Sequence, residues 1–100
     1  MKLLNMSNNM KVAVQILVKG MVQGVGFRYF ALRQANQLGV AGYVKNLADG
    51  DVEIVVEGER EILDYFKKIL KEGPSYGYVE DLVVKELPYE NKYSRFSVEF

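Results

Sequence analysis

The order in which two apolar periodicities follow one another is the feature that most constrains this fold. Apolar residues alternate along 11–19, so that four of them share one face, as is typical of a β-strand. The next apolar residues recur at helical spacing, and the helix they predict ends at Gly39. Strand patterns at 40–46 and 51–57 follow, separated by a turn at 47–50. The first half of the chain therefore has the order β-α-β-β.

The second half of the chain continues with a helix and two further strands. Apolar residues at helical spacing from Ile62 to Leu70 predict a second helix that ends at Gly73. A less clearly patterned strand follows at 78–87, and a short alternating strand at 95–100. The order βαββαβ is the ferredoxin-like plan, an α+β sandwich with two helices on one face of a mostly antiparallel sheet. We expect this fold with a short extra C-terminal strand.

The length of the chain sets the number of domains. A chain of 100 residues can form one core but not two. We expect residues 11–100 to form a single domain and residues 1–10 to form a flexible N-terminal extension. The sequence has no apolar run of about 18 residues, and its first apolar stretch is too short for a signal peptide. We therefore expect a cytoplasmic protein with no membrane partner. We also expect a monomer, although the sequence does not fix the oligomeric state.

The composition excludes several kinds of chemistry. The chain has no cysteine and no histidine, which rules out a thiol nucleophile, a histidine-based triad and the commonest metal ligand. No acidic cluster has the spacing of metal ligands. Residues 1–50 carry six Lys or Arg against one acidic residue, whereas residues 51–100 carry seven against twelve. This uneven charge favours an anionic ligand for the positive half and argues against a long nucleic acid as partner.

The stretch GMVQGVGFR, residues 20–28, joins the first strand to the first helix. The helix has no Ser, Thr, Asp or Asn at its start, so no side chain caps its free N–H groups. Arg28 also lies in the first turn, where the helix dipole disfavours a cation. The glycines alone would suit a flexible connection, and their spacing fits neither a dinucleotide-binding fingerprint nor a phosphate loop of the Walker type.

An anion would account for both anomalies of this helix. Glycines let the backbone approach a ligand closely, and successive N–H groups of such a loop form an anion-binding nest. The N-terminus of the following helix points its N–H groups at the same place. A phosphoryl group there would replace the missing cap, and it would pair with the guanidinium of Arg28 through two parallel hydrogen bonds.

The predicted topology brings Asn46 close to this loop. A right-handed crossover makes the strands 11–19 and 40–46 parallel, and strand 51–57 lies between them. The carboxyl ends of the two parallel strands then meet at one edge of the sheet, where the loop begins and where Asn46 lies. By itself an asparagine at a strand end is more typical of a turn.

Two stretches resemble the sequence signatures of the acylphosphatase family. Residues 20–28 resemble the signature G-x-V-Q-G-V-x-F-R, and residues 42–58 resemble a second signature of the same family. Met21 stands where many members carry arginine, and Leu47 where relatives often carry a small hydroxyl residue. The second signature is matched at Gly42, Tyr43, Val44, Lys45, Asn46, Gly50, Val52 and Gly58.

The resemblance implies an acylphosphatase, an enzyme that hydrolyses acyl phosphates to a carboxylate and inorganic phosphate without metal or cofactor. It also implies that Arg28 and Asn46 are the two key residues. We expect Asn46 to orient a water for in-line attack, because an amide cannot act as a base. The carboxylate leaving group has a pKa of about 4–5 and needs no general acid. The residues expected to bind the phosphate, or a sulfate in its place, are Val22, Gln23, Gly24, Val25, Gly26 and Arg28.

Two other functions are alternatives to acyl phosphate hydrolysis. RNA-recognition domains of this fold stack bases on aromatic residues of a central strand, but strand 51–57 has no aromatic residue and carries three acidic ones, of which we expect Glu53 and Glu57 to be exposed. An anion-binding module without turnover would use the same loop, so that alternative stays open. The sequence also leaves open which acyl phosphate is the physiological substrate: acetyl phosphate, carbamoyl phosphate and 1,3-bisphosphoglycerate all fit.

Overall fold

The computed structural model describes residues 10–100, so the predicted extension lies outside the described residues except for Met10. The order of helices and strands is the predicted one. The elements are β1 (Lys11–Met21), α2 (Phe27–Leu38), β2 (Ala41–Asn46), β3 (Val52–Glu59), α3 (Arg60–Glu72), β4 (Tyr78–Leu87) and β5 (Phe96–Glu99). In this part of the chain neither helix has the length and apolar character needed to cross a membrane.

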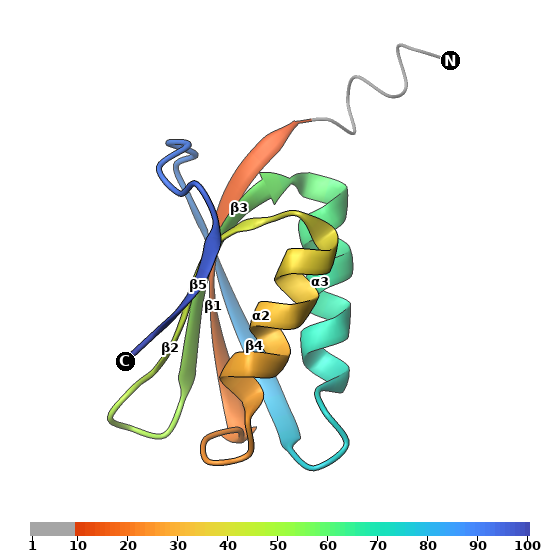
Figure 1. Ribbon diagram of the computed structural model, residues 1–100, viewed down its shortest axis with the longest axis vertical. Helices are drawn as coiled ribbons and strands as arrows, with labels where there is room; N and C mark the ends of the chain where they lie inside the picture. The colour runs from red at the N-terminus through yellow and green to blue at the C-terminus, as the bar shows by residue number, and fades with distance from the viewer. Residues whose placement is uncertain (1–9) are drawn as a thin grey trace.

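The strands form one five-stranded sheet in the order β4-β1-β3-β2-β5. β3 lies antiparallel between β1 and β2, as the crossover rule requires, and β4 adds to the other side of β1. β5 pairs with β2 in parallel at the far edge. Both helices cover the same face of the sheet (Figure 1). The ferredoxin-like fold and the extra C-terminal strand are therefore confirmed.

The core lies between this face and the two helices. Alternate residues of β1 and β3 point into it, while α2 and α3 contribute the rings of Phe27 and Phe66. Burying such large side chains contributes about 1.5–3 kcal/mol each. The fully buried large residues are Phe27, Phe66, Ile16, Ile54, Leu63, Leu70, Val18, Val22, Val44, Val52 and Val56.

Two glycines allow strands to approach more closely than a side chain would permit. A Cβ on Gly42 would collide with the carbonyl oxygen of Val55 on the neighbouring strand, and one on Gly20 would collide with the carbonyl oxygen of Tyr78. The pairing of β1 with β4 shifts register between Lys19 and Gly20. This irregularity lets β1 continue to Met21, two residues beyond the predicted strand, before the glycine loop begins.

The topology places three connections at one end of the sheet. The loop after β1, the turn after β2 and the connection before β4 all lie at the lower end in Figure 1, and the C-terminus lies on the same side as β2. The carboxyl ends of β1 and β2 thus meet as predicted, and the candidate site lies between them.

Candidate active site

The loop between β1 and α2 ends in a left-handed turn that only glycine adopts without strain. Gly24 and Gly26 both have φ of 76°. Gly26 is the N-cap residue of α2, and no side chain within residues 10–100 caps this helix. The first turn of α2 also has no acidic residue. The N-terminal N–H groups of α2 therefore remain available to an anion.

A cavity of about 180 Å³ opens at this end of α2. It brings Arg28 and Asn46 together with the glycines of the loop, although the two side chains lie on different elements. The side chains of Gln23 and Val25 do not line it. The predicted role of these two residues concerns only their main-chain N–H groups, and it stays a prediction. The residues around the cavity are Val22, Gly24, Gly26, Phe27, Arg28, Tyr29 and Asn46.

The C-terminal residues hold the side chain of Arg28. Its Nη1 donates a hydrogen bond of 3.1 Å to the carbonyl oxygen of Glu99, and its guanidinium carbon lies 4.7 Å from the centre of the Phe100 ring. Among residues 10–100 the guanidinium makes only this hydrogen bond, which leaves N–H donors for an acceptor in the cavity. Sequence reasoning missed this contact, because nothing in the pattern of β5 indicates which side chain its end will meet.

The amide of Asn46, a residue that lines the cavity, has an unsatisfied polar atom. Its Oδ1 is buried, and no donor within the described residues reaches it. A buried acceptor without a partner costs about 1–3 kcal/mol, so it marks a place where a bound molecule can donate a hydrogen bond. Lys45, the preceding residue, is exposed on the other side of β2, as expected from strand alternation.

An ion pair links β1 to the start of β3 beside the site. Lys19 Nζ lies 2.7 Å from Asp51 Oδ2. The hydrogen bond that Lys19 donates to Asp51 raises the pKa of Lys19 above its ordinary value, and nearby carboxylates add to the effect. Both groups are partly exposed, so we expect this pair to contribute to geometry more than to stability.

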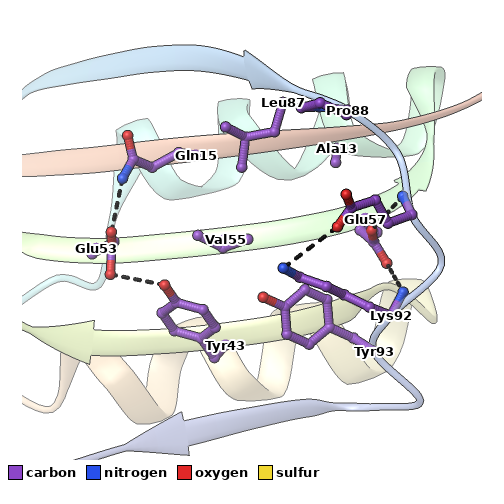
Figure 2. Close-up of a pocket in the computed structure, with 11 residues that line it drawn as sticks. Ala13, Gln15, Tyr43, Glu53, Val55, Glu57, Leu87, Pro88, Lys92 and Tyr93 are labelled. Carbon is purple, nitrogen blue, oxygen red and sulfur yellow. Dashed lines mark hydrogen bonds and ion pairs between the residues drawn. The ribbon is translucent and has the colours of Figure 1, made fainter.

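The opposite face of the sheet carries a larger cavity of about 320 Å³, shown in Figure 2. There the expectation that Glu53 and Glu57 are exposed proves wrong. Glu57 is only 5% exposed, and its carboxylate accepts hydrogen bonds from the main-chain N–H groups of Glu90 (3.1 Å) and Lys92 (3.0 Å). The connection after β4 folds over this face and covers the carboxylate, which strand periodicity does not predict.

Glu53 is also paired on this face. It accepts hydrogen bonds from Gln15 Nε2 (2.8 Å) and from the hydroxyl of Tyr43 (3.0 Å), as Figure 2 shows. Burial and the hydrogen bond to Glu53 raise the pKa of Tyr43 well above its usual range. The Tyr43 ring packs edge-on against Tyr93, at 6.1 Å between ring centres. This ring contact and the two hydrogen bonds to Glu57 fasten the connection between β4 and β5 to the sheet.

Fold and site together define a class of protein: ferredoxin-like domains with a glycine loop, an arginine and an asparagine at one end of the sheet. The acylphosphatase family model matches residues 14–98. The acylphosphatase of Archaeoglobus fulgidus is 48% identical over 89 residues, which are 89% of this chain and 99% of that protein. That of Geobacter sulfurreducens is 40% identical over 91 residues, 91% of this chain and 100% of that protein.

A solved structure agrees with these sequence relatives. The crystal structure of acylphosphatase from Bacillus subtilis superposes with a TM-score of 0.86 at 40% identity, covering 89% of this chain and 99% of that one. The chain therefore belongs to the acylphosphatase family. The resemblance carried by the two sequence signatures is confirmed.

Proposed function

We propose that this protein hydrolyses small acyl phosphates to a carboxylate and inorganic phosphate, using the cavity at the N-terminus of α2. Membership of the acylphosphatase family, matched over residues 14–98, supports this reaction. The roles of individual residues rest on the geometry of the cavity. The proposal includes no metal and no cofactor, since each step below uses only groups of this chain and water.

Main-chain N–H groups of the loop hold the phosphate oxygens. The loop residues concerned run from Val22 to Gly26, and the two left-handed glycines turn this backbone toward the helix end. The unpaired N–H groups and the dipole of α2 favour negative charge at the same point. Inorganic phosphate and sulfate should occupy this site as well, and compete with the substrate.

Arg28 stabilises the charge that develops during phosphoryl transfer. It lines the cavity and contacts Glu99 and Phe100, which favour this position of the guanidinium before substrate binds. A preorganised cation of this kind lowers the barrier because it needs no reorganisation in the transition state. Its planar fork can bind two phosphate oxygens at once.

Asn46 orients the attacking water. Its buried Oδ1 accepts a hydrogen bond from that water and so replaces the missing protein donor. The water attacks phosphorus in line, a phosphate oxygen of the substrate takes its proton, and the P–O bond to the acyl group breaks. The carboxylate leaves unprotonated, because its conjugate acid has a pKa of about 4–5. No histidine or other general acid is required.

The remaining parts of the proposal concern partners and location. We propose a cytoplasmic monomer, as the sequence predicts. We propose no nucleic acid as partner, because β3 carries Glu53 and Glu57 on the face of the sheet opposite the helices and no aromatic residue.

Turnover of a substrate panel tests the function. Acetyl, carbamoyl and benzoyl phosphate should release inorganic phosphate in the presence of EDTA, whereas phosphomonoesters should not. Asn46→Ala should lower kcat about 100- to 1,000-fold, as the loss of one preorganised group does in comparable sites. Binding of phosphate without turnover of any acyl phosphate would favour the anion-binding module instead.

A further inference from the structure

The side chain of Gln23 connects the glycine loop to the turn between β2 and β3. Its Nε2 donates two hydrogen bonds of 2.8 Å, one to the carbonyl oxygen of Leu47 and one to that of Asp51. Both N–H groups of the amide are therefore used, and the group is partly buried. These contacts join segments 24 and 28 residues apart in sequence.

The turn that receives this amide has its own closing bonds. The N–H of Leu47 donates to the carbonyl oxygen of Asp51 at 2.8 Å, and the N–H of Gly50 donates to that of Leu47 at 3.2 Å. The Gln23 amide thus occupies the second lone pair of two carbonyls already used by the turn. Lys19 reaches the same turn through its ion pair with Asp51. The loop and the turn are held together as one unit.

We propose that the Gln23 side chain is a positioning residue that sets the distance between the phosphate-binding loop and Asn46. The carbonyl oxygen of Asp51 accepts hydrogen bonds from both the Gln23 amide and the N–H of Leu47, and that N–H belongs to the peptide between Asn46 and Leu47. Through this shared acceptor the Gln23 side chain fixes the backbone that carries Asn46. The N–H of Gln23 belongs to the loop itself. Gln23 therefore sets the position of Asn46, which orients the water, relative to the loop N–H groups, which bind the phosphate. This inference rests on the proposed function.

Only a side chain with two N–H donors makes this link. Methionine has a similar length and no donor, so Gln23→Met keeps the volume and removes both hydrogen bonds. Glutamate would point a carboxylate at two carbonyl oxygens, which repel it at neutral pH. Gln37, exposed on α2, offers the matched control, because Gln37→Met makes the same chemical change away from the site.

The first test measures kcat for benzoyl phosphate and the inhibition constant of inorganic phosphate. Gln23→Met should lower kcat on the order of 10- to 100-fold, the effect of a small misplacement of reacting groups. Phosphate inhibition should stay within about threefold, because the loop N–H groups remain. In an Asn46→Ala background, Gln23→Met should change kcat by less than about twofold, since the group it positions is gone.

Two results would overturn the inference while leaving the proposed function intact. One is a Gln23→Met enzyme with the kcat of Gln37→Met. The other is a loss of kcat that is as large in the Asn46→Ala background as in the wild-type background. A wild-type protein without turnover would instead contradict the proposed function itself.

Gln23→Glu gives a second route if the methionine variant does not fold. Its activity relative to wild type should rise as the pH falls through the range where a carboxyl protonates, about 4–5 or above beside two carbonyls. The protonated carboxyl can donate one of the two lost hydrogen bonds. A ratio of activities that stays constant across this pH range would contradict the positioning role.

Discussion

The two helices of this protein begin in different ways. α3 follows β3 without a loop, its Arg60 N–H donates to the carbonyl oxygen of Met10 at 2.9 Å, and Glu61 lies in its first turn. α2 begins at a left-handed glycine, has no acidic residue in its first turn and carries Arg28 there. An acidic residue complements the helix dipole, whereas a cation opposes it. Neither helix has a side-chain cap, and Arg60 lies in the first turn of α3 as Arg28 does in that of α2, so the difference rests on Glu61 and on the hydrogen bond to Met10. The chain therefore satisfies the start of α3 better, and the start of α2 is left for an anion to complete.

This difference separates stability from function within one fold. Both helices bury a large aromatic ring against the same sheet, so packing keeps α2 folded despite its unfavourable start. A phosphate bound at the N-terminus of α2 would supply the stabilisation that this helix start lacks. The two helix starts can therefore be perturbed separately.

Removing the guanidinium should have the largest effect. We expect Arg28→Ala to lower kcat/KM for acyl phosphates about 100- to 1,000-fold, or about 3–4 kcal/mol of transition-state stabilisation. Arg28→Lys should restore little, because a point charge cannot reproduce the planar fork. Arg33→Ala, an exposed position of the same helix, is the control and should keep wild-type kinetics. Near wild-type rates for Arg28→Ala would remove the arginine from the mechanism.

Phosphate binding should stabilise the protein through α2. At a phosphate concentration about 100 times its Kd, the free energy of unfolding should rise by about 2.7 kcal/mol. Thermal unfolding with increasing phosphate measures this, at constant ionic strength set with chloride. The rise should disappear in Arg28→Ala and persist in Glu61→Gln. An equal rise in both variants would show that phosphate stabilises the protein away from α2.

Glycines at the two ends of α2 provide a matched pair. Gly26 and Gly39 have φ of 76° and 72°, and a Cβ at either would meet no atom closer than 3.8 Å. Alanine at each position should therefore cost about 1–2 kcal/mol of stability from the left-handed backbone alone. Only Gly26→Ala should also lower kcat/KM, on the order of 10-fold, because it moves N–H groups of the anion nest. Urea unfolding and phosphate-release assays measure the two effects, and an equal loss of activity in both variants would contradict the assignment of the loop.

The regular parts of the molecule were predictable because apolar periodicity reports which face is buried. Val14, Ile16 and Val18 face the core as expected, and β4 has the predicted bounds. The missing cap at the start of α2 could also be predicted from the sequence, because only a few residue types cap helix N-termini. The topology then placed Asn46 beside the loop.

Contacts made by irregular segments could not be predicted in this way. Glu57 alternates like an exposed residue, and it is buried only because the connection after β4 folds across the sheet. The contacts that Arg28 makes with Glu99 and Phe100 depend on where the last strand ends. The Gln23 side chain lies within a recognised motif, yet its partners are carbonyl groups, which every residue has. The sequence therefore does not indicate which main-chain carbonyl a side chain will bind.

We expect the smallest effect from a substitution at the start of α3. Glu61→Gln removes the acidic residue from the first turn of α3, and it should lower the free energy of unfolding by about 0.3–1 kcal/mol at low ionic strength. Salt should reduce this difference, because the side chain is exposed to screening. Activity and phosphate affinity should stay unchanged, since Glu61 lies outside the cavity lining. Urea unfolding at low and high chloride measures the change, and a salt-independent loss would point to packing instead of charge.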